Sequence, residues 1–136
     1  MDMQVNDLVR IGSTARSKAY APYSKFVVGA AVKCKSRAVL AGADIENSSF
    51  GLTICAKESR CDAAVTGGEQ DFVAIAVTAD SDEPIVPCGA CRQFLAEFNP
   101  DLIIVRATVR GQRKIENLSH LFADATRGIL KHADLT

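Results

Sequence analysis

The chain has 136 residues, of which 48% are hydrophobic and 24% charged, a composition typical of one globular domain over residues 1–136. Sixteen basic and sixteen acidic side chains give a net charge of zero, which argues against a nucleic-acid partner because phosphate binding needs a basic surface. No apolar run approaches the length of a membrane span, so we expect no membrane partner. The first twenty residues lack the separate apolar stretch of a signal peptide.

Apolar periodicity and turn signals predict nine elements. In chain order these are a helix over 3–20, strands over 26–32 and 38–47, a helix over 55–65, a strand over 72–78, a helix over 88–98, strands over 102–107 and 108–115, and a helix from 118 onwards. Pro22 favours a loop after the first helix. The short link at 33–37 favours an antiparallel hairpin, and Asn117 is expected to cap the last helix. Strands separated by single helices require parallel crossovers, so the order predicts a mixed sheet with helices on its faces.

Five cysteines stand at positions 34, 55, 61, 88 and 91. An odd number without a secretion signal favours a reducing compartment, and we expect a cytoplasmic protein. Two of the cysteines, Cys88 and Cys91, follow Pro87 at a predicted helix start and share one face of the first turn. The helix N-terminus lowers thiol pKa there. This motif alone is compatible with a metal site, a redox pair or two buried small residues.

Cys55 favours the metal. It opens the predicted helix one crossover earlier, and two successive helices on one face of a sheet place their N-termini side by side. Three converging thiolates, with a fourth position left to water, are typical of catalytic zinc; a chance group of buried cysteines is the alternative. We expect structural roles for Cys34 and Cys61, and solvated or capping roles for His120 and His132.

Five segments together resemble the small cytidine deaminases, which are zinc-dependent enzymes acting on free nucleosides. They are Tyr20-Ala-Pro-Tyr-Ser-Lys-Phe26, Val28-Gly-Ala-Ala31, Asp44-Ile-Glu-Asn47, Cys55-Ala56 and Pro87-Cys-Gly-Ala-Cys-Arg-Gln93. The resemblance extends from the first helix to about Ile115. It implies a three-layer α/β/α domain with a five-stranded mixed sheet. It also implies a homotetramer whose sites are completed by neighbouring subunits.

The resemblance further implies the chemistry. A zinc ion held by the cysteines makes hydroxide, which adds to C4 of cytosine, and a glutamate that is not a metal ligand transfers the protons. Phe26 is expected to stack on the pyrimidine, Asp44 and Glu46 to bind the ribose, and Ala56 to belong to the substrate-binding residues. The alternatives are that Phe26 is a core residue and that Glu46 only ends a strand.

The chain departs from the family where the protons are transferred. The family pattern is Cys-Ala-Glu-Arg, whereas this chain has Lys57 at the glutamate position and Glu58 at the arginine position. A lysine is protonated near pH 7 and has no acceptor. Glu58 is a possible substitute, but adjacent helix residues point in different directions.

Two smaller departures are Asp44, where the family has asparagine, and the segment 121–126, where it has a Leu-Leu-Pro-like sequence. Two functions therefore remain open: deamination of cytidine or deoxycytidine in pyrimidine salvage, impaired by Lys57, or an inactive homologue that binds zinc and a nucleoside. A dithiol redox protein using Cys88 and Cys91 is the third alternative.

Overall fold

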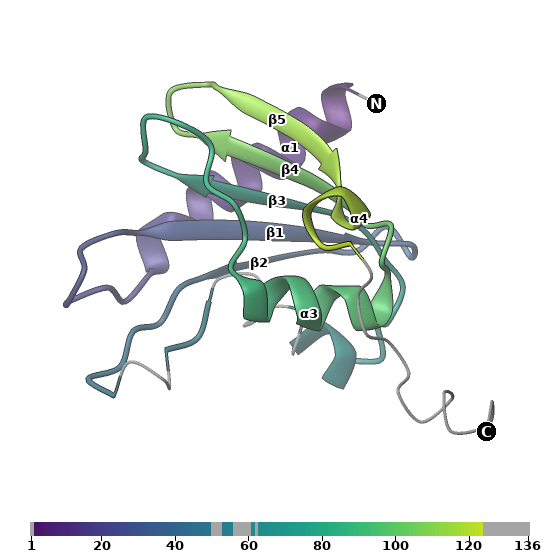
Figure 1. Ribbon diagram of the computed structural model, residues 1–136, viewed down its shortest axis with the longest axis horizontal. Helices are drawn as coiled ribbons and strands as arrows, with labels where there is room; N and C mark the ends of the chain where they lie inside the picture. Colours follow the sequence, from purple (N-terminus) through teal and green to yellow (C-terminus); the bar gives the residue numbers. More distant parts are fainter. Residues whose placement is uncertain (1, 50–52, 56–60, 62, 124–136) are drawn as a thin grey trace.

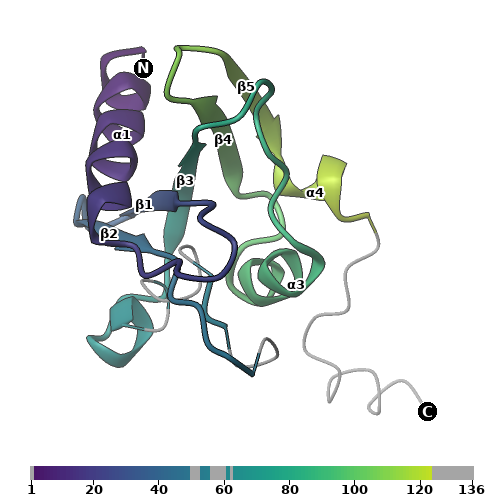
Figure 2. The ribbon, with the colours of Figure 1, turned by 90° about the vertical axis from the view of Figure 1, so that its left-hand side faces the viewer.

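A five-stranded sheet with helices on both faces makes up the fold (Figures 1 and 2). The computed structural model of the chain describes residues 2–49, 53–55, 61 and 63–123. Helix α1 covers one face of the sheet, and α3 lies against the other (Figure 2). The three-layer arrangement and the five-stranded mixed sheet are as the sequence predicts.

The elements follow the predicted order. They are α1 (Asp2–Ala15), a 3-10 turn (Arg16–Lys18), β1 (Val28–Cys34), β2 (Val39–Ala43), β3 (Phe72–Ala79), α3 (Gly89–Phe98), β4 (Ile103–Thr108), β5 (Arg113–Asn117) and α4 (Leu118–Leu121). Residues 61 and 63–66 are helical as well, so the described end of the helix predicted over 55–65 lies one residue later than predicted. The Asn117 side chain caps α4 by accepting a hydrogen bond from the N–H of Ser119, which confirms the predicted cap.

The strands stand in the order β2-β1-β3-β4-β5. Strand β1 pairs antiparallel with both β2 and β3, so the predicted hairpin is confirmed. Strands β3 and β4 pair in parallel and are joined through α3, while β5 returns antiparallel to β4. The crossover through α3 is the one that the strand–helix–strand pattern requires, and it places α3 on the face of the sheet opposite α1 (Figure 2).

Two predicted strand boundaries are wrong because hydrogen bonds outside the sheet compete with strand pairing. The first strand starts at Val28 rather than at residue 26, because the N–H of Phe26 donates to the Ser24 hydroxyl and that of Val28 to the Asp44 carboxylate. The second strand ends at Ala43 rather than at 47, since Ile45 forms bridges outside the hairpin.

At the other end of the chain, the strand predicted over 108–115 lies at 113–117 instead. Gly111 adopts a φ of +100° in the turn before it, a left-handed conformation that favours glycine. The first helix also ends earlier than predicted, at Ala15, with a 3-10 turn following it.

The core lies on both faces of the sheet. On one face, Leu8 and Val9 of α1 pack on small buried residues of β1, β3 and β4. On the other face, Leu95 and Ala96 of α3 pack against Ile75 and Ile104. Within the described ranges, no helix has both the length and the apolar character needed to cross a membrane.

One glycine fixes how closely α1 lies on the sheet. A Cβ atom placed on Gly29 of β1 would lie 2.0 Å from the carbonyl oxygen of Gly12 in α1. No side chain fits in that space, so the helix and the strand make direct backbone contact here. A Cβ atom on Gly12 would lie 3.4 Å from the nearest backbone atoms of Ala30 and Ala31, an ordinary contact, so Gly29 is the residue that allows the close approach.

Candidate functional site

Three cysteine thiols meet at the start of α3. The Sγ atoms of Cys55, Cys88 and Cys91 all lie within 4.8 Å of one another. Those of Cys55 and Cys88 are 3.7 Å apart, and those of Cys88 and Cys91 are 2.9 Å apart. The structure thus brings together the three cysteines that the sequence singles out, from segments 33 residues apart in the chain.

The start of α3 fixes two of these thiols. Cys88 is the N-cap residue, in an extended conformation, and its Sγ accepts a hydrogen bond from the N–H of Cys91 at 3.4 Å. Pro87 before it is fully buried, whereas Cys88 is exposed and Cys91 is 1% exposed. The cluster therefore has one side set into the protein and one side open to solvent.

The donor set fits zinc. In a tetrahedral site with Zn–S bonds of about 2.3 Å, neighbouring sulfurs lie about 3.8 Å apart. The Cys55–Cys88 pair already has this spacing, and the closer Cys88–Cys91 pair would need to separate by about 1 Å. Three thiolates with one open side leave a fourth position for water or a ligand, which is the pattern of catalytic rather than structural zinc.

A second group of residues is tied to Cys55 by the backbone. Ile45 and Ile54 form an antiparallel bridge, with N–H to carbonyl distances of 2.8 and 2.9 Å in the two directions. This bridge places the segment 44–46 alongside 53–55, which ends at the cluster. The N–H of Asn47 also donates to the Thr53 hydroxyl at 3.2 Å. Asp44 and Glu46, the residues expected to bind ribose, are therefore held beside the segment 53–55, which carries Cys55.

Glu46 organises the loop that precedes β1. Its carboxylate accepts hydrogen bonds from the N–H groups of Tyr23 and Ser24, at 3.0 and 3.1 Å, and from the Ser24 hydroxyl. The Ser24 hydroxyl is the main cause that lowers the pKa of Glu46 below its usual range; the two N–H groups and the charge of Lys25 add to it, while partial desolvation opposes it. Glu46 is thus an ionised anchor for the loop.

The loop before β1 and the Glu46 side chain line a shallow hollow. Its volume is about 390 Å³, and it is lined by Tyr23, Ser24, Glu46 and Thr53. Tyr23, Ser24 and Thr53 were not predicted as site residues; the family-like segment 20–26 contains two of them, whereas Thr53 carries no signal in the sequence.

Phe26 lies in the same loop and is 40% exposed, so the alternative that it is a core residue is wrong. Asp44 and Glu46 bind different parts of the backbone. The Asp44 carboxylate accepts a hydrogen bond from the N–H of Val28 at 3.1 Å, so it ends the sheet ladder at the first residue of β1.

Several predictions fall elsewhere. Ala56, Lys57, Glu58 and His132 lie outside the described residues. Cys34 and Cys61 are fully buried in the core between the sheet and α3. Burial, with the nearby Glu69 carboxylate as a second cause, raises the pKa of the Cys34 thiol and keeps it neutral. His120 is exposed in α4, and among the described residues it is not part of the metal-binding group.

Comparisons with known proteins agree on one family. The profile described as the cytidine and deoxycytidylate deaminase zinc-binding region matches residues 3–107. The chain is 44% identical to the cytidine deaminase of Halalkalibacterium halodurans, over 92% of this chain and 94% of that protein. It is 35% identical to the cytidine deaminase of Mycobacterium tuberculosis, over 91% of this chain and 90% of that one.

The fold agrees with solved structures as well. The crystal structure of cytidine deaminase from Burkholderia pseudomallei superposes with a TM-score of 0.86 at 39% identity. The match covers 89% of this chain and 98% of that one. A cytidine deaminase structure from Mycobacterium leprae gives a TM-score of 0.76 at 32% identity, covering 88% of this chain and 97% of that one.

Proposed function

Because the chain belongs to the cytidine and deoxycytidylate deaminase family, we propose that it is a single-domain, zinc-dependent hydrolase that deaminates cytidine or deoxycytidine in pyrimidine salvage. The observation that carries the proposal is the cluster of three thiols within 4.8 Å, set beside the segment that holds Asp44 and Glu46. A metal and a nucleoside sugar can be bound there by neighbouring stretches of chain.

Cys55, Cys88 and Cys91 are the proposed zinc ligands. When bound, zinc would supply the Lewis acidity that makes water a nucleophile near neutral pH. The protein's part is to hold three thiolates and leave one side open, and the exposure of Cys88 beside the buried Cys91 supports this.

The loop before β1 and the segment 44–46 are the proposed nucleoside site. Phe26, which is 40% exposed, offers a ring face for the pyrimidine. The carboxylates of Glu46 and Asp44 offer acceptors for ribose hydroxyls. Both carboxylates are already fixed by backbone N–H donors, so the sugar would meet acceptors in defined positions. We place Ala56, which follows the ligand Cys55, in the same site.

Lys57 makes the proposed activity weak. A protonated lysine cannot accept the proton that an attacking water loses, which is the task of the family's glutamate at this position. Glu58 is a possible substitute. The second candidate function is an inactive homologue that binds zinc and a nucleoside, and Lys57 is the residue that favours it.

Our proposal for assembly and location is based on the same family resemblance. We propose a homotetramer in which neighbouring subunits complete each site, and a cytoplasmic setting, where a reducing environment keeps the three ligand thiols available. The net charge of zero supports a nucleoside rather than a nucleic acid as the substrate.

Two measurements on the full chain test the proposal. Metal analysis should find one zinc ion per chain, lost in Cys55→Ala, Cys88→Ala and Cys91→Ala but retained in Cys34→Ala, the matched control. The change in ultraviolet absorbance as cytidine becomes uridine reports turnover. Full zinc occupancy in Cys55→Ala would exclude the three-ligand site. Zinc binding without turnover, even after prolonged incubation, would leave the binding homologue as the function.

A further inference from the structure

The connection from β3 to α3 ends at the metal cluster, and it is irregular along its whole length. It runs from residue 80 to Cys88 and contains Pro84 and Pro87, neither of which has an N–H to donate. A segment without helix or strand pairing depends on side chains to fix its path. Since Cys88 is its last residue, the path of this connection sets where the Cys88 thiol lies relative to Cys55.

A buried arginine of β4 holds the middle of the connection. Arg106 is 8% exposed and is one of few buried polar residues in the described part of the chain. Its Nε donates to the carbonyl oxygen of Ile85 at 3.0 Å, and its Nη2 donates to that of Pro84 at 2.9 Å. These carbonyls belong to the residues three and four positions before Cys88.

The guanidinium is itself fixed by β5. Its Nη1 donates to both carboxylate oxygens of Glu116, each at 3.0 Å. Arg106 pairs with Lys114 across the β4–β5 ladder, so Glu116 is the next residue along on the same face of β5. A planar guanidinium with several donors can bind a carboxylate and two carbonyls at once, which a lysine ammonium cannot do in this geometry.

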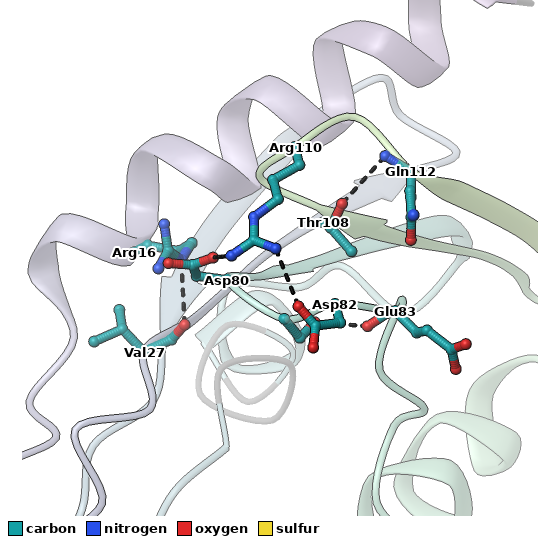
Figure 3. Close-up of polar contacts among 9 residues, drawn as sticks. Arg16, Val27, Asp80, Asp82, Glu83, Thr108, Arg110 and Gln112 are labelled. Atoms are coloured by element: carbon teal, nitrogen blue, oxygen red, sulfur yellow. Dashed lines mark hydrogen bonds and ion pairs between the residues drawn. The ribbon is translucent and has the colours of Figure 1, made fainter.

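A second arginine of the same hairpin holds the start of the connection, but from the solvent side. Arg110 lies in the turn between β4 and β5 and reaches Asp80 at 3.4 Å and Asp82 at 3.0 Å (Figure 3). Its side chain is 64% exposed, and ion pairs at that exposure contribute little because water and salt screen them. Arg110 is therefore a matched control: it has the same charge and binds the same connection, but it is solvated and its partners lie six and eight residues before Cys88 in the chain.

We propose that Arg106 is a positioning residue of the metal site, which holds residues 84–85 so that the Cys88 thiol meets those of Cys55 and Cys91. The inference rests on the proposed function in one respect, that these three thiols bind zinc. Arg106 touches neither the metal nor the substrate and acts only through the backbone that leads to Cys88. Groups that hydrogen-bond directly to metal ligands typically change metal affinity by about 10- to 100-fold when they are removed. Arg106 acts through the backbone between Ile85 and Cys88, so we expect the low end of that range.

Two substitutions of Arg106 test the proposal. Arg106→Lys keeps a positive charge opposite Glu116 but loses the planar set of donors, and Arg106→Met loses both. Zinc affinity is measured on the full chain by competition with a chromophoric chelator. We expect zinc affinity to fall by about 10-fold or more in Arg106→Lys, further in Arg106→Met, and not at all in Arg110→Ala.

A spectroscopic readout separates positioning from general stability. Cobalt(II) in place of zinc gives thiolate charge-transfer and ligand-field bands that depend on the ligand arrangement. We expect these bands to change in Arg106→Lys and to match the parent in Arg110→Ala, with the thermal unfolding of the metal-free proteins compared as a check on folding.

Each outcome is decisive. Parent-like zinc affinity and cobalt spectra in a folded Arg106→Lys protein would overturn the role of Arg106 while leaving the zinc site intact. If Arg106→Met does not fold, Arg106→Lys alone decides. If the parent protein itself binds no zinc, the proposed function fails, and the positioning role fails with it.

Discussion

Two neighbouring regions of the site differ in how far they retain the family's chemistry. The metal region retains all three cysteines, and their Sγ atoms lie within 4.8 Å of one another. We propose that the two residues after Ala56 do not retain that chemistry, because Lys57 and Glu58 stand where the resemblance implies a glutamate and an arginine. Holding a metal needs thiolates at the right spacing, whereas transferring a proton needs an acceptor of suitable pKa. These requirements fall on different residues, so one can be lost while the other remains.

The largest expected effect comes from restoring the family's residues at 57 and 58. Lys57→Glu supplies a proton acceptor, and Glu58→Arg replaces a negative charge by a positive one three residues after Cys55 in the sequence. We expect the double variant to exceed the starting protein in kcat by roughly 10²- to 10⁴-fold, the range typical of general acid–base catalysis. Lys57→Glu alone should recover only part of this. Steady-state rates of the zinc-loaded proteins test this ranking of kcat, from the double variant through Lys57→Glu to the starting protein.

Lys57→Gln is the control for this comparison, because it removes the positive charge without supplying a base. Rates in Lys57→Gln that equal those in Lys57→Glu would show that the charge of Lys57, and not the missing acceptor, limits turnover. The positive charge at position 57, rather than a missing base, would then be what separates this region from the metal region.

A smaller effect is expected at the base-binding position. Stacking of a base on an aromatic ring contributes about 1–3 kcal/mol, so Phe26→Ala should weaken nucleoside binding by roughly 5- to 150-fold. Phe26→Tyr keeps the ring and should bind like the parent. Calorimetric titration with a cytidine analogue measures both variants. Equal affinity in the parent and in Phe26→Ala would show that the base binds elsewhere. The loop before β1 would then not be part of the nucleoside site.

The smallest effect concerns pH at the sugar side of the site. The Ser24 hydroxyl, followed by the N–H groups of Ser24 and Tyr23, lowers the pKa of Glu46 in the folded protein. A carboxylate with a lowered pKa stabilises the fold above the unfolded value of about 4.3, and this stabilisation is lost as the pH falls through the lower folded value.

Carboxyl NMR titration of the metal-free protein should therefore find Glu46 titrating below about 4.3, and Ser24→Ala should move its pKa upward. A Glu46 pKa that is unaffected by Ser24→Ala would mean that the hydroxyl does not fix the anchor. The loop would then not be pre-organised for a ligand.

Local signals made the fold and the metal cluster predictable. Pro87 marks the start of α3, and nearly continuous apolar runs mark the buried strands on both sides of it. One crossover separates Cys55 from Cys88, and crossover connections in a sheet have one preferred hand. The two helices that begin at these cysteines are therefore expected on the same face of the sheet, with their thiols side by side. The prediction therefore needed only residue spacing and topology.

Contacts between distant residues were not predictable in the same way. Nothing in the sequence shows that the Glu46 carboxylate turns back to the N–H groups of residues 23 and 24, or that Asp44 ends the sheet ladder. Arg106 stands in an otherwise apolar strand, and its partners are 10 to 22 residues away. Such contacts depend on the packed geometry rather than on a period or a motif.

A single-turnover experiment tests the central claim most directly, because it measures binding and chemistry in one sample. Zinc-loaded protein is mixed with cytidine at a protein concentration that exceeds both the nucleoside concentration and the dissociation constant. The bound fraction is then measured by ultrafiltration and the product by ultraviolet absorbance. Our account predicts that cytidine is bound and remains unconverted over the time in which the Lys57→Glu, Glu58→Arg variant converts all of it. Conversion of bound cytidine by the starting protein as fast as by that variant would contradict the account.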